Sequence, residues 1–478
     1  MLFNSIPFAL FFPVVFFCYW FVVGKNLRAQ NLLLLIASYF FYASWDWRFV
    51  FLLAFSTLLD YVSGRQIASA STSIRKKTWL VLSVCINLGF LGIFKYYNFF
   101  AESFATLLDG IGLQVHPSTL QVILPVGISF YTFHGLSYVI DIYRGKIEPE
   151  TNLVRYGVFV SFFPLLVAGP IERATHLLPQ IKTARTFDQG RAVDGLRQII
   201  WGLFKKVVIA DQCAVYVNQI FDPAADYHGS TLLLGAVLFA FQIYGDFSGY
   251  SDMALGIARL LGIELFRNFS YPYFSRDIAE FWRRWHISLS TWFRDYVYIP
   301  LGGSRGSTRT KIRNIFIIFL LSGFWHGANW TFLLWGLLNA LYMVPQMLSN
   351  SHRDHINIVA EGKSLPTVKE ALMILLTFFL TVIAWIFFRA ENVSQAFSVI
   401  QSIFSPSLFS TLEIFPAVLF ALILGFILVE WWGRERPYAI QRIPFYNYLP
   451  VRWGFYVLLI NLILIFQGGS QEFIYFQF

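Results

Sequence analysis

Long apolar runs recur along this chain, and they constrain its fold more than any other feature. The first run covers 6–23, a second covers roughly 31–45, and a further run covers roughly 78–97. A helix needs about 20 mostly apolar residues to cross the hydrocarbon core of a bilayer. We therefore predict an all-α polytopic membrane protein.

The composition excludes the soluble and disordered classes. Of the 478 residues, 57% are hydrophobic and only 13% are charged, against about 25% in an ordinary soluble domain. Lys and Arg number 36 against 27 Asp and Glu. In a polytopic membrane protein such an excess usually lies in the loops, where the cations set the orientation of the spans. No basic stripe interleaved with aromatic residues indicates nucleic-acid binding, and three Cys in apolar runs indicate neither a disulfide framework nor a thiolate metal site.

The positions of the cations predict how the first spans are oriented. The run 6–23 has no Lys or Arg before it, and Lys25 and Arg28 follow it. A cleavable signal peptide has the reverse order, so we expect an uncleaved first span with the N-terminus outside. The cations of 65–77 and the cation-free stretch 97–139 follow the alternation that this orientation requires.

The rest of the chain adds further candidate spans. They cover 122–140, 156–167, 196–217, 232–247, 315–344, 371–388, 417–432 and 455–466. We expect about 11 to 13 crossings or half-crossings in one domain, 1–478. The polar stretch 349–369 is predicted to be an extramembrane loop.

His326 is the leading candidate for chemistry. It lies in the uncharged run 315–344, which as one helix would measure about 45 Å and exceed a hydrocarbon core of about 30 Å. We expect a break marked by Gly323, Gly327 and Asn329, because irregular backbone at this depth requires protein or a water-filled cavity around it. An imidazole at such a break is either functional or a hydrogen-bonded structural group.

The segment 277–296 combines an apolar stripe with cations. Its large apolar residues step by three or four, as on one face of an amphipathic helix, and they are Ile278, Phe281, Trp285, Leu289, Trp292 and Tyr296. We predict that this helix lies in the membrane interface. Arg283 and Arg284 lie off the stripe, where they would either anchor the helix or bind phosphate, with His286 directed into the protein.

Two carboxylates and one further imidazole lie in or beside apolar segments. Asp246 and Asp252 stand among hydroxyls and glycines, and because an acid at mid-membrane costs about 2.5–3.5 kcal/mol on insertion scales, we expect them to cap helix ends or line a polar cavity. His134 suits a structural role better. The Gly-x-Ser-x-Gly pattern at 302–306 lacks a strand–turn–helix context and predicts no nucleophile elbow.

Together these motifs resemble the membrane-bound O-acyltransferase family, most closely its alginate-acetylating branch. The resemblance runs from the first residue to the last and is carried by 247–254, 268–274, 280–292, 298–303, 323–327 and 473–478. At Phe324 the family more often has Leu, a difference that affects local packing and leaves the histidine in place.

The resemblance implies a helical bundle around a central tunnel in the inner (cytoplasmic) membrane. An acyl thioester, expected to be acetyl-CoA, would enter from the cytosol. A hydroxyl acceptor on an exopolysaccharide such as alginate, or an extracytoplasmic acetyltransferase that relays the group, would approach from outside. His326 and His286 match the catalytic positions, since a neutral imidazole can take the proton of an attacking hydroxyl, and the chemistry requires no bound metal or cofactor.

The residues expected to bind substrate are Asn329, Arg283, Arg284, Trp285, Trp325 and Asp246. If the segment is helical there, Asn329 would share a helix face with His326 and could hydrogen-bond the thioester carbonyl or the developing oxyanion. Two alternatives stay open. One is D-alanyl transfer to teichoic acid from an acyl-carrier protein, and the other is a transporter or flippase in which the buried acids and histidines bind the cargo.

Overall fold

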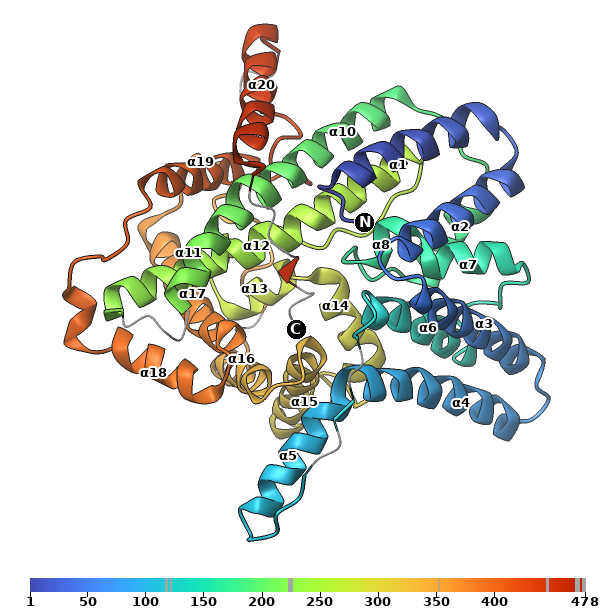
Figure 1. Cartoon of the computed structure of the whole chain (residues 1–478), viewed down its shortest axis with the longest axis horizontal. Helices are drawn as coiled ribbons and strands as arrows, with labels where there is room; N and C mark the ends of the chain where they lie inside the picture. Colours follow the sequence, from blue (N-terminus) through green and yellow to red (C-terminus); the bar gives the residue numbers. More distant parts are fainter. Residues whose placement is uncertain are drawn as a thin grey trace. The chain divides into compact units, whose positions relative to one another are not determined.

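The computed structural model describes residues 1–116, 119–120, 123–221, 227–351, 353–443, 447–468 and 473–474 (Figure 1). Within these ranges the chain forms helices and no β-strand, which confirms the all-α prediction. The chain divides into two compact units, one made of 1–192 and 257–266, the other of 193–256 and 267–478. The single domain expected over 1–478 stays a prediction. Of the terminal motif 473–478, only the first two residues are described.

Nine α-helices lie wholly within the described part of the first unit. They are α1 (Ile6–Phe17), α2 (Leu27–Ala43), α3 (Arg48–Ser69), α4 (Ser73–Leu91), α5 (Tyr97–Asp109), α6 (Ile128–Tyr143), α7 (Leu153–Ser161), α8 (Phe163–Leu166) and α9 (Ala174–Lys182). The chain then passes into α10 (Gln189–Phe204), most of which belongs to the second unit.

The second unit holds most of the long α12 and all the later helices of the described chain. They are α11 (Asp211–Phe221), α12 (Gly229–Leu260), α13 (Ile278–Arg284), α14 (Ile287–Phe293), α15 (Thr308–His326), α16 (Trp330–Leu348), α17 (Val368–Arg389), α18 (Val393–Ile403), α19 (Ala417–Gly433) and α20 (Leu449–Phe466). A π-helical turn, Lys205–Ala210, joins α10 to α11, and a second, Arg294–Tyr298, follows α14.

Several helices are long and apolar enough to cross a membrane. Within the described residues the qualifying segments are 73–109, 229–260, 330–348, 368–389 and 449–466, and shorter apolar helices cover 6–22 and 417–433. Several predicted spans thus coincide with helices that have the length and composition of a membrane span, whereas the count of about 11 to 13 and the outside N-terminus stay predictions. The extramembrane position of 349–369 also stays a prediction, and the last two residues of that stretch, Val368 and Lys369, begin α17.

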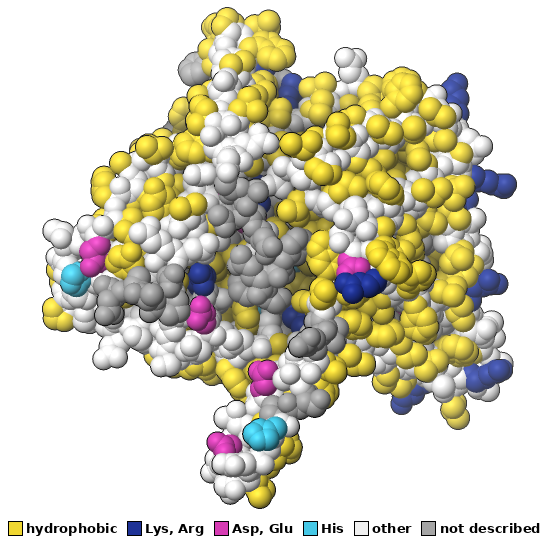
Figure 2. Space-filling view, in the orientation of Figure 1, with side chains coloured by type: hydrophobic (Ala, Val, Ile, Leu, Met, Phe, Trp, Pro, Cys, Tyr) yellow, Lys and Arg dark blue, Asp and Glu magenta, His cyan; other side chains and the backbone are white. Residues whose placement is uncertain are grey.

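The surface of the first unit carries many exposed apolar side chains. Figure 2 shows them over the helices α1 to α4, with Lys and Arg side chains spaced along the right-hand edge of the view. Arg75 and Lys77, near the start of α4, are exposed, and so are Lys25 and Arg28 beyond α1. An apolar surface of this extent is typical of a protein that contacts lipid rather than water.

The break predicted within 315–344 is confirmed, and it places His326. The first helix, α15, ends at His326, and α16 begins at Trp330 after the N-cap Asn329. The two helices lie side by side (Figure 1) because glycines allow their backbones to approach. A Cβ added to Gly323 would lie 2.3 Å from the carbonyl oxygen of Phe332, so this position accommodates only glycine without a shift.

The single interfacial helix predicted at 277–296 is wrong in two respects. The segment forms two short helices, α13 and α14, separated at Trp285 and His286. His286 has a φ of 42°, a left-handed conformation that ends the helical path. Most of the apolar stripe is also buried within the protein, with Trp285 only 1% exposed. The same amphipathic pattern is expected whether the apolar face of a helix contacts lipid or the protein core. Here that face packs against the protein core.

Candidate active site

A cavity of about 520 Å³ in the second unit brings the two predicted catalytic histidines together. His326 and His286 are both buried and both line it. Large apolar side chains of α13, α15 and α16 form much of the remaining wall, among them Trp282, Phe319, Met343 and Met347. A mostly apolar cavity with a few convergent polar groups is typical of a small-molecule site.

Three exposed arginines line the same cavity. Arg283, Arg294 and Arg353 are exposed, whereas His326 and His286 are 4% and 1% exposed. The wall of the cavity therefore combines cationic side chains that reach solvent with buried imidazoles. Guanidinium groups pair with phosphate oxygens in a bidentate geometry, so these arginines suit a ligand that carries phosphate.

His326 is held by aromatic rings at the end of α15. The helix ends there because Gly327 adopts an extended conformation, with φ −161° and ψ 153°. The imidazole packs against Trp325, Trp335 and Phe388, at ring-centroid distances of 4.8, 5.1 and 5.2 Å. These edge-on contacts restrict the orientation of the imidazole, as a group that must meet a reacting atom requires.

His286 lies outside the candidate spans, at the break between α13 and α14. Its Nδ1 is 2.9 Å from Oδ1 of Asn268. Burial lowers the pKa of the His286 imidazole to about 3, because the charged form loses its hydration. His286 is therefore neutral at physiological pH. The Trp325 ring contacts this imidazole too, at a centroid distance of 6.1 Å, so it packs against both histidines.

The two adjacent arginines differ in their environments. Arg283 lines the cavity and donates through Nη2 to the carbonyl of His355 at 2.7 Å. Arg284 is not among the residues that line the cavity, and its Nη2 lies 2.7 Å from the carboxylate of Glu280, which is 1% exposed. The geometry supports a ligand-binding role for Arg283 and a structural role for Arg284.

The predicted placement of Asn329 on the His326 helix face is wrong. Asn329 begins α16 as its N-cap, and its Oδ1 accepts a hydrogen bond from the Thr331 N–H at 3.0 Å. Its Nδ2 donates to the carbonyl of Glu391 at 2.9 Å. The prediction assumed that the helix continued through Gly327, where the chain is extended instead. By contrast, Trp285 is buried and lines the cavity.

Asp246 lies within α12 rather than at a helix end, and it does not line the cavity. Its Oδ1 is 2.7 Å from Nζ of Lys206, and its Oδ2 accepts from the Ile474 N–H at 2.7 Å. Lys206 also pairs with Asp211 at 2.8 Å, and all three charged side chains are buried. A buried acid of this kind is tolerated because it is paired, so the geometry assigns Asp246 to the fold.

Sequence reasoning missed Lys205 and Glu430, two buried charged residues that lie in the same cavity wall as Asp252. Asp252 is 2.6 Å from Nζ of Lys205 and helps to line a separate small polar cavity, as expected of it. Glu430 of α19 lines that cavity and accepts a hydrogen bond from the Tyr244 hydroxyl at 2.8 Å. The sequence does contain a pattern that could have indicated these residues. Two lysines lie within the apolar run 196–217, and lysines at such positions require acidic partners.

His134 has the environment of a structural histidine. It is 1% exposed in the first unit, and its Nε2 accepts a hydrogen bond from the backbone N–H of Glu172 at 3.1 Å. This contact ties α6 to the segment before α9. It agrees with the interpretation favoured by the sequence.

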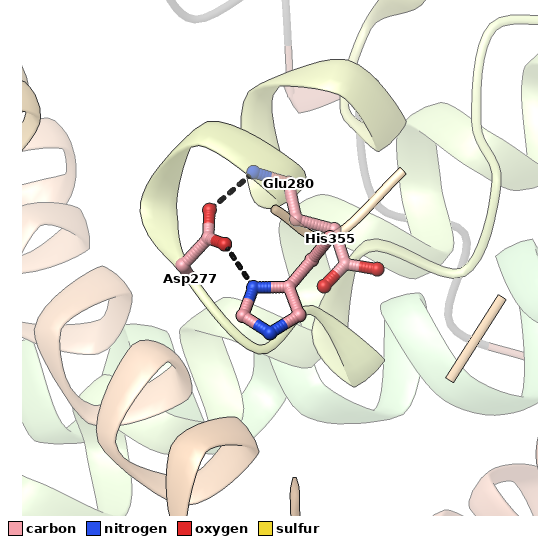
Figure 3. Close-up of side chains that lie close together, drawn as sticks. All are labelled: Asp277, Glu280 and His355. Atoms are coloured by element: carbon pink, nitrogen blue, oxygen red, sulfur yellow. Dashed lines mark hydrogen bonds and ion pairs between the residues drawn. The ribbon is translucent and has the colours of Figure 1, made fainter. Parts of the chain in front are cut away.

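One group of acidic and histidine side chains in the described chain has the spacing of a metal site. Figure 3 shows Asp277, Glu280 and His355, whose nearest ligand atoms lie within 4.8 Å of one another. Asp277 accepts from the Glu280 N–H at 2.7 Å and lies 2.6 Å from His355 Nδ1. Glu280 already pairs with Arg276 and Arg284. A cation would compete with two guanidinium groups for Glu280, so the cluster fits a structural role that fixes the start of α13.

Comparison with known proteins places the chain among acyltransferases. The model of the membrane-bound O-acyltransferase family matches residues 150–388. A Pseudomonas aeruginosa protein named probable alginate O-acetylase AlgI is 40% identical over 444 residues, 92% of this chain and 82% of that protein. The peptidoglycan O-acetyltransferase of Helicobacter pylori is 36% identical over 430 residues, with coverages of 84% and 79%. The teichoic acid D-alanyltransferase of Bacillus subtilis is 31% identical over 241 residues, with coverages of 48% and 60%.

The chain therefore belongs to the membrane-bound O-acyltransferase family. It is an O-acyltransferase and a multi-pass membrane protein. Because the chain belongs to a family of acyltransferases, the alternative that it is a transporter or flippase is excluded. The roles of His326, His286 and the other site residues stay predictions, which the geometry of the cavity now sharpens.

Proposed function

We propose that the protein transfers an acetyl group from cytosolic acetyl-CoA to a hydroxyl group of an exopolysaccharide, such as alginate, outside the cytoplasmic membrane. The names of the relatives with the broadest coverage support acetyl as the group and a glycan as the acceptor. The teichoic acid D-alanyltransferase covers 48% of this chain, so D-alanyl transfer is the second candidate.

The main support for this proposal is the composition of the cavity wall. The cavity joins exposed arginines, suited to the phosphates of CoA, to buried His326 within one apolar enclosure. In the reaction the acceptor oxygen attacks the thioester carbonyl while His326 takes the hydroxyl proton. The tetrahedral intermediate then expels the thiolate of CoA, which recovers that proton. General-base assistance of this kind contributes about 10² to 10⁴ in rate.

The orientation follows from where acetyl-CoA is made. The exposed arginines of the cavity face the cytosol, and the N-terminus lies outside. Lipid surrounds the apolar helices, and an extracytoplasmic acetyltransferase receives the acetyl group or assists its transfer to the polymer. Cysteines introduced at Arg309 and Glu102 test this orientation in a background free of Cys85, which is exposed. An impermeant thiol reagent applied outside should label position 102 and spare 309, and the reverse pattern would invert the topology.

The function is tested in cells that depend on this protein for exopolysaccharide acetylation. His326→Ala should leave the protein in the membrane and abolish acetyl ester in the polymer. The matched control is His228→Ala, since His228 is an exposed histidine of the same unit that pairs with Glu413. Normal acetylation by His326→Ala would exclude His326 from the mechanism, and D-alanyl ester in place of acetyl would favour the second candidate.

A further inference from the structure

One asparagine, Asn268, lies within hydrogen-bond distance of the His286 imidazole. Asn268 Oδ1 lies 2.9 Å from His286 Nδ1 and accepts a hydrogen bond from the Ser288 hydroxyl at 2.9 Å. The Ser288 backbone N–H also points at this oxygen, at 3.4 Å. Because a backbone N–H can only donate, the oxygen and not the nitrogen of the amide faces His286. The Asn268 nitrogen donates instead to Ser251 Oγ at 3.2 Å.

This arrangement fixes the tautomer of His286. Since Asn268 Oδ1 can only accept, Nδ1 of the neutral imidazole carries the proton and Nε2 has the free lone pair. Nε2 is buried and has no hydrogen-bond partner among the described residues. His286 lines the cavity, but Nε2 itself has no surface exposed to it, so a ligand reaches Nε2 when the neighbouring side chains of the wall shift. A buried acceptor without a partner is costly, and a ligand in the cavity that donates a hydrogen bond would satisfy it.

The backbone supports the same arrangement. His286 keeps a φ of 42°, a conformation that side-chain-bearing residues seldom adopt unless neighbouring contacts hold them there. The N–H of Ile287 donates to the carbonyl of Asn268 at 2.9 Å. The ring of Phe247 packs edge-on against the imidazole at 4.6 Å. Asn268 therefore holds both the ring of His286 and the residue that follows it.

We propose that Asn268 is a positioning residue for acyl transfer, which holds His286 in the Nδ1–H tautomer and presents Nε2 to the cavity as a hydrogen-bond acceptor for an N–H or O–H group of the thioester donor. The inference rests on the proposed function, because it takes the cavity as the donor site. The pantetheine arm of CoA carries amide N–H groups that can donate to Nε2. His326 then acts as the base, and His286 orients the donor.

The test is steady-state transfer from acetyl-CoA by the purified full chain. Asn268→Leu removes the acceptor of the Nδ1 proton, and Asn268→Asp keeps it. Asn268→Leu should raise the KM for acetyl-CoA about 3- to 10-fold with kcat within about twofold, as expected for the loss of one oriented hydrogen bond in ground and transition states alike. Asn268→Asp should restore most of the affinity.

A double-mutant cycle separates positioning from folding. If Asn268 acts through His286, the KM of Asn268→Leu/His286→Ala equals that of His286→Ala. Asn339→Leu is the matched control, because it removes a buried amide that donates to the carbonyl of Trp335 on its own helix, and it should leave KM unchanged. Additive effects in the cycle, or an Asn268→Asp variant as impaired as Asn268→Leu at equal abundance, would overturn the proposal.

A second measurement does not depend on the folding of any Asn268 variant. In wild-type protein labelled with ¹⁵N-histidine, the His286 signals, assigned by their loss in His286→Ala, should show a protonated Nδ1 and an unprotonated Nε2. The opposite tautomer would overturn the proposal. If the proposed function is wrong, the wild-type protein will not transfer acetyl from acetyl-CoA. The tautomer of His286 can still be measured in that case, so it tests the role of Asn268 independently.

Discussion

The buried ionic group around Lys206 predicts an unusual response to mutation. Its ammonium lies 2.7 Å from Asp246 and 2.8 Å from Asp211, and none of the three side chains is more than 4% exposed. Lys206→Met leaves two buried carboxylates without this partner. Lys206→Met/Asp246→Asn leaves only one. The double variant should therefore be more stable than Lys206→Met alone.

The magnitude follows from the cost of a buried charge that has lost its partner. Removing one member of a buried pair costs about 3–5 kcal/mol, a large part of a total stability of about 5–15 kcal/mol. Asp246→Asn should cost about 3 kcal/mol, at the low end of that range, because Lys206 keeps Asp211. Lys206→Met should cost about 5 kcal/mol, and adding Asp246→Asn to it should recover about 1–3 kcal/mol, because it removes one of the two buried carboxylates that have lost their partner.

The assay is thermal unfolding of each purified variant in detergent, followed by intrinsic tryptophan fluorescence. At about 2–4 °C per kcal/mol, Asp246→Asn should lower the apparent Tm by about 6–12 °C. The double variant should unfold above Lys206→Met. A double variant less stable than Lys206→Met would refute the pairing. An unchanged Tm for Asp246→Asn together with a raised substrate KM would return Asp246 to the substrate-binding role that the sequence suggested.

Three further variants test the site. Gly323→Ala should destabilise the protein or displace His326 and lower kcat, because the added Cβ meets the Phe332 carbonyl, whereas Gly425→Ala on α19, where nothing lies within 4 Å, should have little effect on either. Arg283→Ala should raise the KM for acetyl-CoA about tenfold at near-normal kcat, and a collapsed kcat at unchanged KM would contradict a donor-binding role. Asn329→Ala should cost about 0.5–2 kcal/mol of stability as a lost N-cap, and a large loss of kcat at unchanged stability would restore it to the oxyanion role.

The elements that depend on local sequence were predictable. The long apolar runs specify helices, and the glycines around 323–327 mark the break that leaves His326 at a helix end. What the sequence did not show was whether an apolar stripe faces lipid or protein. The stripe of 277–296 has the same spacing in either case, and only the fold shows that Trp285 and Leu289 are buried.

Contacts between distant segments were the second limit. Lys206 and Asp246 are 40 residues apart, so the sequence presented Asp246 as an unpaired acid and suggested a role at the substrate. Asn268 and His286 are 18 residues apart, and both belong to motifs that carry the family resemblance. Their hydrogen bond depends on the left-handed conformation of His286, which the apolar spacing of 277–296 does not predict.

The most direct test of the account is acetyl transfer by the purified protein from radiolabelled acetyl-CoA to an oligosaccharide acceptor, with the extracytoplasmic partner present where transfer requires it. Wild type should form acetylated oligosaccharide, and His326→Ala should lose at least about 100-fold in kcat, as expected for the loss of a general base. Binding of acetyl-CoA should stay within a few-fold of wild type, because the exposed arginines remain. Transfer by His326→Ala at the wild-type rate would contradict the central claim that this imidazole activates the acceptor.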